Sequence, residues 1–212
     1  GELSKILSDN TLGKQRVVFL PKEDRFLSKN FQNLNFEKHQ SIGAEMIYST
    51  GVSIDVNNKK KSLLIRQSNY HDWILVRNAD LKDWKITFIG VRSDFDNEVK
   101  DQRFNYYGMT GCLNFYNTNF QESYIDTYGG KCEDSLNISN STGSIASLKV
   151  EDSFQDAVDL DFSNLSIGNI VVKRSGNDCL DLSGGVYEVN KAVLEQCNDK
   201  GISVGEKSIL KT

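Results

Sequence analysis

The 212-residue sequence has a single proline, Pro21, and only two histidines, His39 and His71. One proline argues against a proline-rich linker or a mucin-like stalk. So few histidines, and four cysteines that form no CxxC pair, argue against a structural zinc site. No apolar stretch reaches the roughly 18–20 residues of a membrane-spanning helix. The formal net charge is −4, so no basic excess recruits nucleic acid. We therefore expect no nucleic-acid partner and no membrane insertion.

Helical periodicity is also missing from the regular part of the chain. A helical repeat needs about ten or more continuous residues with apolar positions at a 3.6-residue period, and no repeat unit has them. Glycine, asparagine, aspartate and serine are abundant instead, with 16 glycines. These residues tolerate tight corners, so the composition indicates a chain that turns often.

Short strings repeat through the second half of the sequence. They are Cys132–Ile138, Phe154–Leu160, Gly176–Leu182 and Cys197–Val204. Their third positions hold Asp134, Asp156, Asp178 and Asp199, spaced 22, 22 and 21 residues apart. A second polar column follows at Asn137, Asp159, Asp181 and Ser203, and it is flanked by the apolar pairs Leu136/Ile138, Val158/Leu160, Leu180/Leu182 and Ile202/Val204.

Two further alternating segments keep the same step in each unit. One is marked by Leu148/Val150, Ile170/Val172 and Ala192/Leu194, and the other by Ile145, Ile167 and Val189. Such a unit cannot bury its apolar face alone, but stacked copies can. The pattern predicts an all-β fold, a right-handed single-stranded parallel β-helix with rungs of about 22 residues. A β-sandwich also uses short strands, but its strands need not keep a fixed step.

We interpret residues 1–212 as a single β-helix domain, and as a fragment of a longer chain. Residues 1–40 form the N-terminal cap region, in which residues 2–12 are expected to form a short capping helix. Residues 41–95 form the early rungs, residues 96–111 a long loop insertion, and residues 112–212 the regular rungs. Loops of this length are often functional.

The aspartate columns allow two interpretations. In one, the corner aspartates accept turn hydrogen bonds, as Asx-turns do. In the other, stacking about 4.8 Å apart gathers them into a carboxylate cluster suited to acid–base work on a sugar or to Ca²⁺ ligation. Ca²⁺ is the single cofactor candidate, and otherwise we expect none.

Three of these strings, Phe154–Asp159, Asn177–Leu182 and Cys197–Gly205, resemble the motifs of the polygalacturonase family. These enzymes are β-helix glycoside hydrolases that cleave pectin. The resemblance covers about 55 residues. It implies that Asp156 and Asp178 take the places of catalytic acids, while Asn177 and Lys200 replace an aspartate and a histidine.

The resemblance therefore implies an incomplete catalytic set. An inverting glycosidase needs a carboxylic acid and a carboxylate, and an asparagine cannot supply the proton. Any catalysis would rest on Asp156, Asp178, Asp181 and Lys200, as a glycoside hydrolase or as a polysaccharide lyase or epimerase with a lysine base. Asp159, Asn177, Tyr106 and Tyr107 are the candidate substrate-binding residues.

The cysteines also allow two interpretations. Their composition alone favours buried free thiols at Cys112, Cys132, Cys179 and Cys197. The polygalacturonase resemblance implies instead a Cys179–Cys197 disulfide, because that family commonly pairs the first of these cysteines with one in the next rung.

Taken together, these features predict an extracellular or cell-surface β-helix that binds or processes polysaccharide or a surface glycan. Whether it is an enzyme is left open. The alternative is a non-catalytic structural or adhesion module of a larger surface protein, which the incomplete catalytic set fits equally well.

Overall fold

The described part of the chain winds into a coil of β-strands. The structure is a computed structural model that describes residues 34–39, 43–70, 72–91, 105 and 107–212. Its strands are β1 (Leu34–His39), β2 (Ala44–Ser49), β3 (Val52–Asn57), β4 (Ser62–Gln67), β5 (Ile74–Arg77), β6 (Asp80–Lys82), β7 (Lys85–Ile89), β8 (Gly111–Tyr116), β9 (Asn119–Tyr128), β10 (Asp134–Ser139), β11 (Thr142–Ser153), β12 (Asp156–Ser175), β13 (Leu180–Val189), β14 (Ala192–Cys197) and β15 (Ile202–Lys211). These residues contain no helix that is long and apolar enough to span a membrane.

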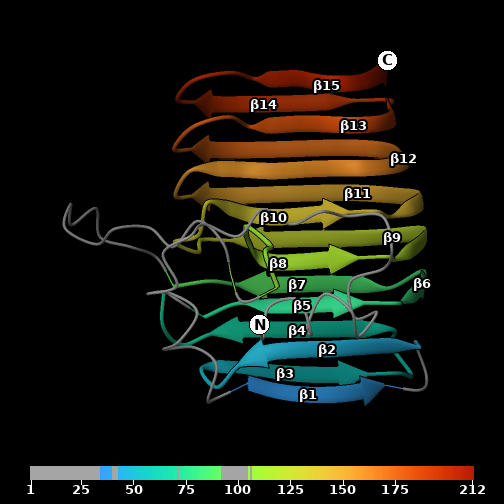
Figure 1. The fold of residues 1–212 in the computed structure, drawn as a ribbon, viewed down its shortest axis with the longest axis vertical. Helices are drawn as coiled ribbons and strands as arrows, with labels where there is room; N and C mark the ends of the chain where they lie inside the picture. Colours follow the sequence, from blue (N-terminus) through green and yellow to red (C-terminus); the bar gives the residue numbers. More distant parts are fainter. Residues whose placement is uncertain (1–33, 40–42, 71, 92–104, 106) are drawn as a thin grey trace, which may run out of the picture.

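Three parallel ladders run along the coil (Figure 1). The first ladder joins β5, β8, β10 and the beginnings of β12, β13 and β15. The second joins β6, the beginnings of β9 and β11, the middle of β12 and the ends of β13 and β15. The third joins β4, β7, the ends of β9, β11 and β12, and β14.

The spacing of the ladders confirms the predicted repeat. Asn137 pairs with Asp159, and Asp159 pairs with Asp181, each one turn of 22 residues further along the chain. Parallel pairing of successive turns makes the fold a parallel β-solenoid and excludes the sandwich, whose sheets are antiparallel. The right-handed sense stays a prediction, supported by the general handedness of parallel crossovers.

Apolar side chains from the three ladders fill the interior of the coil. The predicted inward pairs Leu136/Ile138, Val158/Leu160, Leu180/Leu182, Leu148/Val150 and Ile170/Val172 are all 0% exposed. Each such side chain contributes roughly 1.5–3 kcal/mol when fully buried. Ile202 and Val204 occupy the same inward positions but are 37% and 51% exposed, because β15 has a neighbour on one side of the first ladder only.

A column of left-handed residues marks the corner after the first ladder. Its members have positive φ and are Asn78, Asn117, Asn140, Phe162, Gly184 and Glu206. Asparagine and glycine adopt this conformation most readily, which explains their abundance in the sequence. Phe162, at φ 47°, and Glu206, at φ 45°, are the members of this column that are neither asparagine nor glycine.

The N-terminal end of the coil departs from the expected series of rungs over residues 41–95. Strand β2 pairs antiparallel with both β1 and β5, and β3 pairs antiparallel with β4. Regular parallel stacking begins where β4 meets β7 and β5 meets β8. The helix expected over residues 2–12, and residues 96–104 and 106 of the expected loop insertion, lie outside the described residues.

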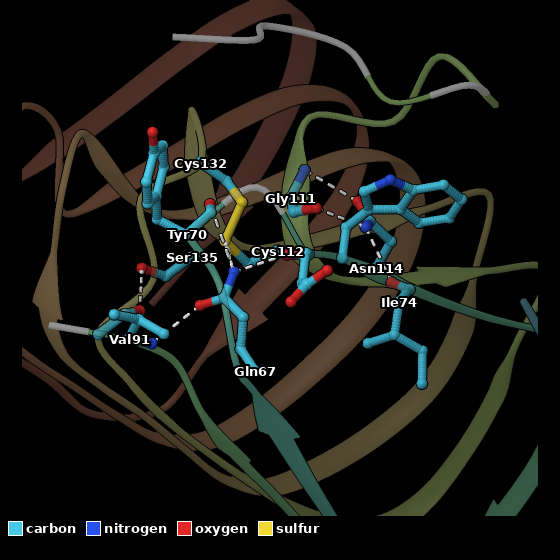
Figure 2. Close-up of a disulfide and its surroundings, with 12 residues drawn as sticks. Gln67, Tyr70, Ile74, Val91, Gly111, Cys112, Asn114, Cys132 and Ser135 are labelled. Atoms are coloured by element: carbon cyan, nitrogen blue, oxygen red, sulfur yellow. Dashed lines mark hydrogen bonds between the residues drawn. A yellow bond between two sulfur atoms is a disulfide. The ribbon is translucent and has the colours of Figure 1, made fainter. Parts of the chain in front are cut away.

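Two disulfides tie neighbouring turns together. Cys179–Cys197 confirms the pairing that the family resemblance implied, and Cys112–Cys132 is a second bridge. The expectation of free thiols is wrong for all four cysteines. Beside the Cys112–Cys132 bridge, the buried amide of Gln67 accepts the Val91 N–H at 2.9 Å and donates to Asp72 O at 2.6 Å, which joins three segments around the sulfur atoms (Figure 2).

Candidate functional site

The second predicted column lies on the outward side of the first ladder. Asn114, Asn137, Asp159, Asp181 and Ser203 are in register on successive turns, and we call them the polar column. Their neighbours along each strand are apolar and point into the core, so alternation directs the polar column away from it. Asn114 and Asn137 are fully buried, whereas Asp159, Asp181 and Ser203 are partly exposed.

The corner aspartates serve as acceptors between turns. Asp156 Oδ1 accepts the Asp178 N–H at 2.8 Å and the Asn177 amide at 2.7 Å. One turn later, Asp178 Oδ1 accepts the Lys200 N–H at 2.9 Å. The acceptor role predicted for the corners is therefore present, but the bonds bridge two turns rather than closing a local Asx-turn. Burial raises the pKa of Asp156, and these two hydrogen bonds oppose that rise.

The last residue of the first predicted column differs from the prediction. Since Leu180 pairs with Ile202, the residue in line with Asp178 is Lys200, and Asp199 lies one position earlier. Lys200 Nζ lies 2.6 Å from Asp199 Oδ2 and 3.3 Å from Asp178 Oδ2. The hydrogen bond to Asp199, followed by that to Asp178, raises the pKa of Lys200. A lysine held in its charged form is poorly suited to act as a general base.

Two members of the polar column, Asn137 and Asp159, form a largely buried acidic cluster with two neighbouring aspartates. We define it as Asp134, Asn137, Asp159 and Asp161. Asn137 Nδ2 donates to Asp159 Oδ2 at 2.9 Å and to Asp161 Oδ2 at 3.1 Å. Asp134 is 2% exposed and Asn137 0%, and two of their oxygens, Asp134 Oδ2 and Asn137 Oδ1, have no hydrogen-bond partner among the described residues.

The surroundings of two carboxyl groups in the cluster favour their protonated form. Burial, followed by repulsion from neighbouring carboxylates, raises the pKa of both Asp134 and Asp159 well above the usual range of aspartate. The sequence predicted Asp134 and Asp159 as column members but did not single out Asp161. Strand alternation contains the signal, because Asp161 occupies the next outward position after Asp159.

Within the described ranges, no group of three or more histidine, cysteine, aspartate or glutamate side chains is arranged to hold a metal ion. Asp134, Asp159 and Asp161 are close enough to influence one another's titration but do not form such a group. Ca²⁺ binding stays a prediction, which an experiment described below addresses.

The aromatic residues do not gather beside the acids. Tyr107 lies edge-on to Trp73 with ring centroids 6.1 Å apart, in an apolar cluster with Leu75, Met109 and Tyr116. Burial raises the pKa of Tyr107. Leu75 is in line with Asn114, so this cluster lies on the same side of the coil as the polar column but nearer its N-terminal end. Tyr106 lies outside the described residues.

Other aromatic side chains lie either in the core or on the surface of the third ladder. Phe115 is fully buried, whereas Tyr124, on the third ladder, is 42% exposed, with Lys85 Nζ 5.9 Å from its ring centroid. The structure thus brings together Asp156, Asn177, Asp178 and Lys200 at one corner, with Asp159 and Asp181 on the adjoining strands. It does not bring Tyr107 to them.

Comparisons with known proteins identify no relative of this chain. No family model, no curated protein and no solved structure matches it. The description of the site therefore depends on its own geometry.

Proposed function

We propose that this chain is a secreted or cell-surface β-solenoid module that binds a neutral, hydroxyl-rich polysaccharide along the polar column without cleaving it. The observation that carries the proposal is the register of Asp159, Asp181 and Ser203, which repeat turn by turn and stay partly exposed. A carboxylate accepts hydrogen bonds from sugar hydroxyls, and a serine hydroxyl accepts hydrogen bonds from them or donates to them. Their repetition at about 4.8 Å suits an extended polymer rather than a compact ligand.

Charge favours a neutral polymer over the polyuronates that the polygalacturonase resemblance suggests. The chain has a net charge of −4 and the column carries Asp181, so an anionic polymer is repelled. Lys200, the cation beside the column, already contacts Asp178 and Asp199.

The side chains at the corner favour binding over hydrolysis. Asp156 and Asp178 stand where the polygalacturonase resemblance places catalytic acids. Each accepts a hydrogen bond from a backbone N–H of the next turn. The raised pKa of Lys200 disfavours a lyase or epimerase that depends on a lysine base. Two disulfides support the proposed location, because such bonds persist in oxidising compartments.

The proposal is tested with the double variant Asp159→Asn/Asp181→Asn. Native affinity electrophoresis compares its retardation in gels with a soluble β-glucan, a galactomannan or polygalacturonate. We expect the parent protein to be retarded by a neutral polymer, and the double variant to lose at least about tenfold in affinity, since a hydrogen bond to a charged acceptor such as Asp181 contributes about 1.5–3 kcal/mol. Circular dichroism checks that the variant is folded.

Glu188→Gln is the matched control, because Glu188 is exposed and lies on β13, like Asp181, but on the second ladder. It should keep the retardation of the parent protein. A parent protein that no neutral polymer retards would overturn the proposal. Release of reducing sugar from any of the three polymers would contradict the absence of cleavage.

The second candidate function is a structural or adhesion module of a larger surface protein. It is favoured by the same corner bonds, which show that Asp156 and Asp178 connect successive turns. Asp156→Ala is expected to lower the free energy of unfolding by roughly 1–3 kcal/mol, because the Asp178 N–H loses its acceptor. Chemical denaturation measures this loss, and an unchanged stability would remove the support for a corner role.

A further inference from the structure

Phe162 is an exposed aromatic side chain within the regular part of the coil. It is 53% exposed, although a further turn is stacked on each side of its own. Ile202, Val204 and Ile209 are also strongly exposed, but they lie on β15, the last strand of the coil, whereas Tyr124, which is 42% exposed, lies on the third ladder. The exposure of Phe162 is therefore not a consequence of an uncovered end.

Its backbone conformation is unfavourable for a bulky residue. Phe162 has a φ of 47° in the corner column where four other turns place asparagine or glycine and the last turn places Glu206. A bulky side chain in the left-handed region is a genuine outlier, and such outliers concentrate at functional sites. The fold itself would accept asparagine at this position.

The neighbouring turn leaves space for the ring. A Cβ atom added to Gly184 would lie 2.7 Å from Phe162 Cδ1 and 2.9 Å from Cε1, so one edge of the ring rests on that glycine. Gly184 is buried, while the ring above it stays half exposed. The arrangement presents the phenyl ring at the corner instead of folding it into the core.

The backbone beneath the ring is held in place by Tyr187. Its Oη lies 2.8 Å from Leu160 O and 2.7 Å from Gly184 O, and it accepts the Ser163 N–H at 3.3 Å. One buried hydroxyl thus connects the chain on both sides of Phe162 to the turn that supports the ring. The backbone that carries the ring is therefore held by the fold itself, which reduces the entropy lost on binding.

Two polar side chains lie on β13, the strand that leads to the glycine beneath the ring. Asp181 and Ser183 are partly exposed, and both leave β13 on the outward side because Leu180 and Leu182 point into the core. Ser183 immediately precedes Gly184, on which the ring rests. A pyranose has the matching chemistry, with C–H groups on its face and hydroxyl groups around its rim. The C–H groups suit the negative face of an aromatic ring.

We propose that Phe162, with Asp181 and Ser183, forms a stacking subsite for one neutral sugar ring of the bound polysaccharide. This inference rests on the proposed function and specifies where on the coil the sugar is held. The ring supplies the apolar contact, and the two side chains of β13 supply the hydrogen bonds that select hydroxyl groups.

The experiment compares Phe162→Trp, Phe162→Leu and Phe162→Asn by affinity electrophoresis in the same β-glucan and galactomannan gels. Tryptophan is expected to keep the retardation. Leucine and asparagine are expected to weaken it at least about tenfold. Phe162→Asn should melt at the same temperature as the parent protein or higher, because asparagine suits the left-handed corner. Tyr124→Leu is the matched control, since it removes an exposed ring from the third ladder, and it should leave retardation unchanged.

The outcomes separate the two proposals. If the parent protein is retarded and the leucine and asparagine variants are retarded equally, the subsite is overturned and the proposed function stands. If Tyr124→Leu abolishes retardation instead, the sugar stacks on the third ladder and the subsite is likewise overturned. If no neutral polymer retards the parent protein, the proposed function itself fails. Loss of binding together with a lower melting temperature in both the leucine and asparagine variants would make Phe162 a structural residue.

Discussion

The variant Cys112→Ser/Cys132→Ser is expected to lose about 3 kcal/mol of unfolding free energy, which is the cost of opening a loop of this size in the denatured chain. The bridge spans 20 residues, nearly one turn, and lies in the middle of the coil. The buried Gln67 amide beside the bridge is hydrogen-bonded to Val91 N–H and to Asp72 O. Loss of the bridge therefore disturbs three segments at once. Chemical denaturation under non-reducing conditions measures the change, and the melting temperature should fall by roughly 6–12 °C.

The second bridge provides the comparison. Cys179–Cys197 spans 18 residues and closes a similar loop, but it holds β14 next to the end of the coil. In a stack where each turn contacts only its neighbours, opening this bridge should loosen the last turn locally. We expect Cys179→Ser/Cys197→Ser to speed hydrogen exchange in β14 and β15 while β8 and β10 keep their protection. Equal loss of protection in all four strands would contradict this local effect.

Raising the pH from 4 to 8 is expected to lower the stability of the protein. Burial and mutual repulsion raise the pKa of Asp134 and Asp159 in the folded state, so the folded chain binds more protons than the unfolded chain. The stabilisation from these protons is fully present below the unfolded pKa of about 3.9 and is lost as the pH rises through the folded values. Denaturation midpoints measured across this range in the presence of EDTA test the sign.

The variant Asp134→Asn should flatten this pH profile. The amide keeps the size of the carboxyl group but cannot ionise, so the variant should match the parent at pH 4 and be more stable than the parent at pH 8 by on the order of 1 kcal/mol or more.

Glu151→Gln is the control of opposite sign. The hydrogen bond from Lys149 lowers the pKa of Glu151, so replacing Glu151 by glutamine lowers the stability at neutral pH. The loss of stability with rising pH that the acidic cluster causes should remain in this variant. A parent protein that becomes more stable from pH 4 to 8 would contradict the role of the cluster. Repeating the profile with added Ca²⁺ tests whether a cation can replace the protons.

The sequence was sufficient to predict the coil wherever inward positions repeat at a constant step. Leu136, Val158 and Leu180 mark this step directly, and the paired strands follow from it. Alternation does not distinguish parallel from antiparallel pairing, since both direct every second side chain inward. The sequence therefore predicts early rungs where β2 and β3 pair antiparallel, and it places β1 in the cap region.

The candidate site was predicted less completely. Asp199 was placed in the first column because its surrounding letters match the repeat, whereas the core pair Ile202/Val204 fixes Lys200 in register instead. The burial of Asp134, and the contact of Asn137 with both Asp159 and Asp161, depend on packing between turns that spacing cannot supply. For the Cys112–Cys132 bridge a signal exists. Cys112 follows a corner position and Cys132 precedes the next corner, and Cys179 and Cys197 are placed in the same way.

The constant 22-residue step also affects how quickly the chain can find its fold. Most contacts of the coil join residues one turn apart, or about 0.1 of the 212-residue length. That relative separation is in the range of helical bundles rather than of sandwiches and barrels, which close long loops before they gain contacts. Once one pair of turns has formed, each further turn has a preformed edge to join. An all-β chain of this kind should therefore fold by rapid addition of one turn after another, without the slow search that distant strand pairing imposes.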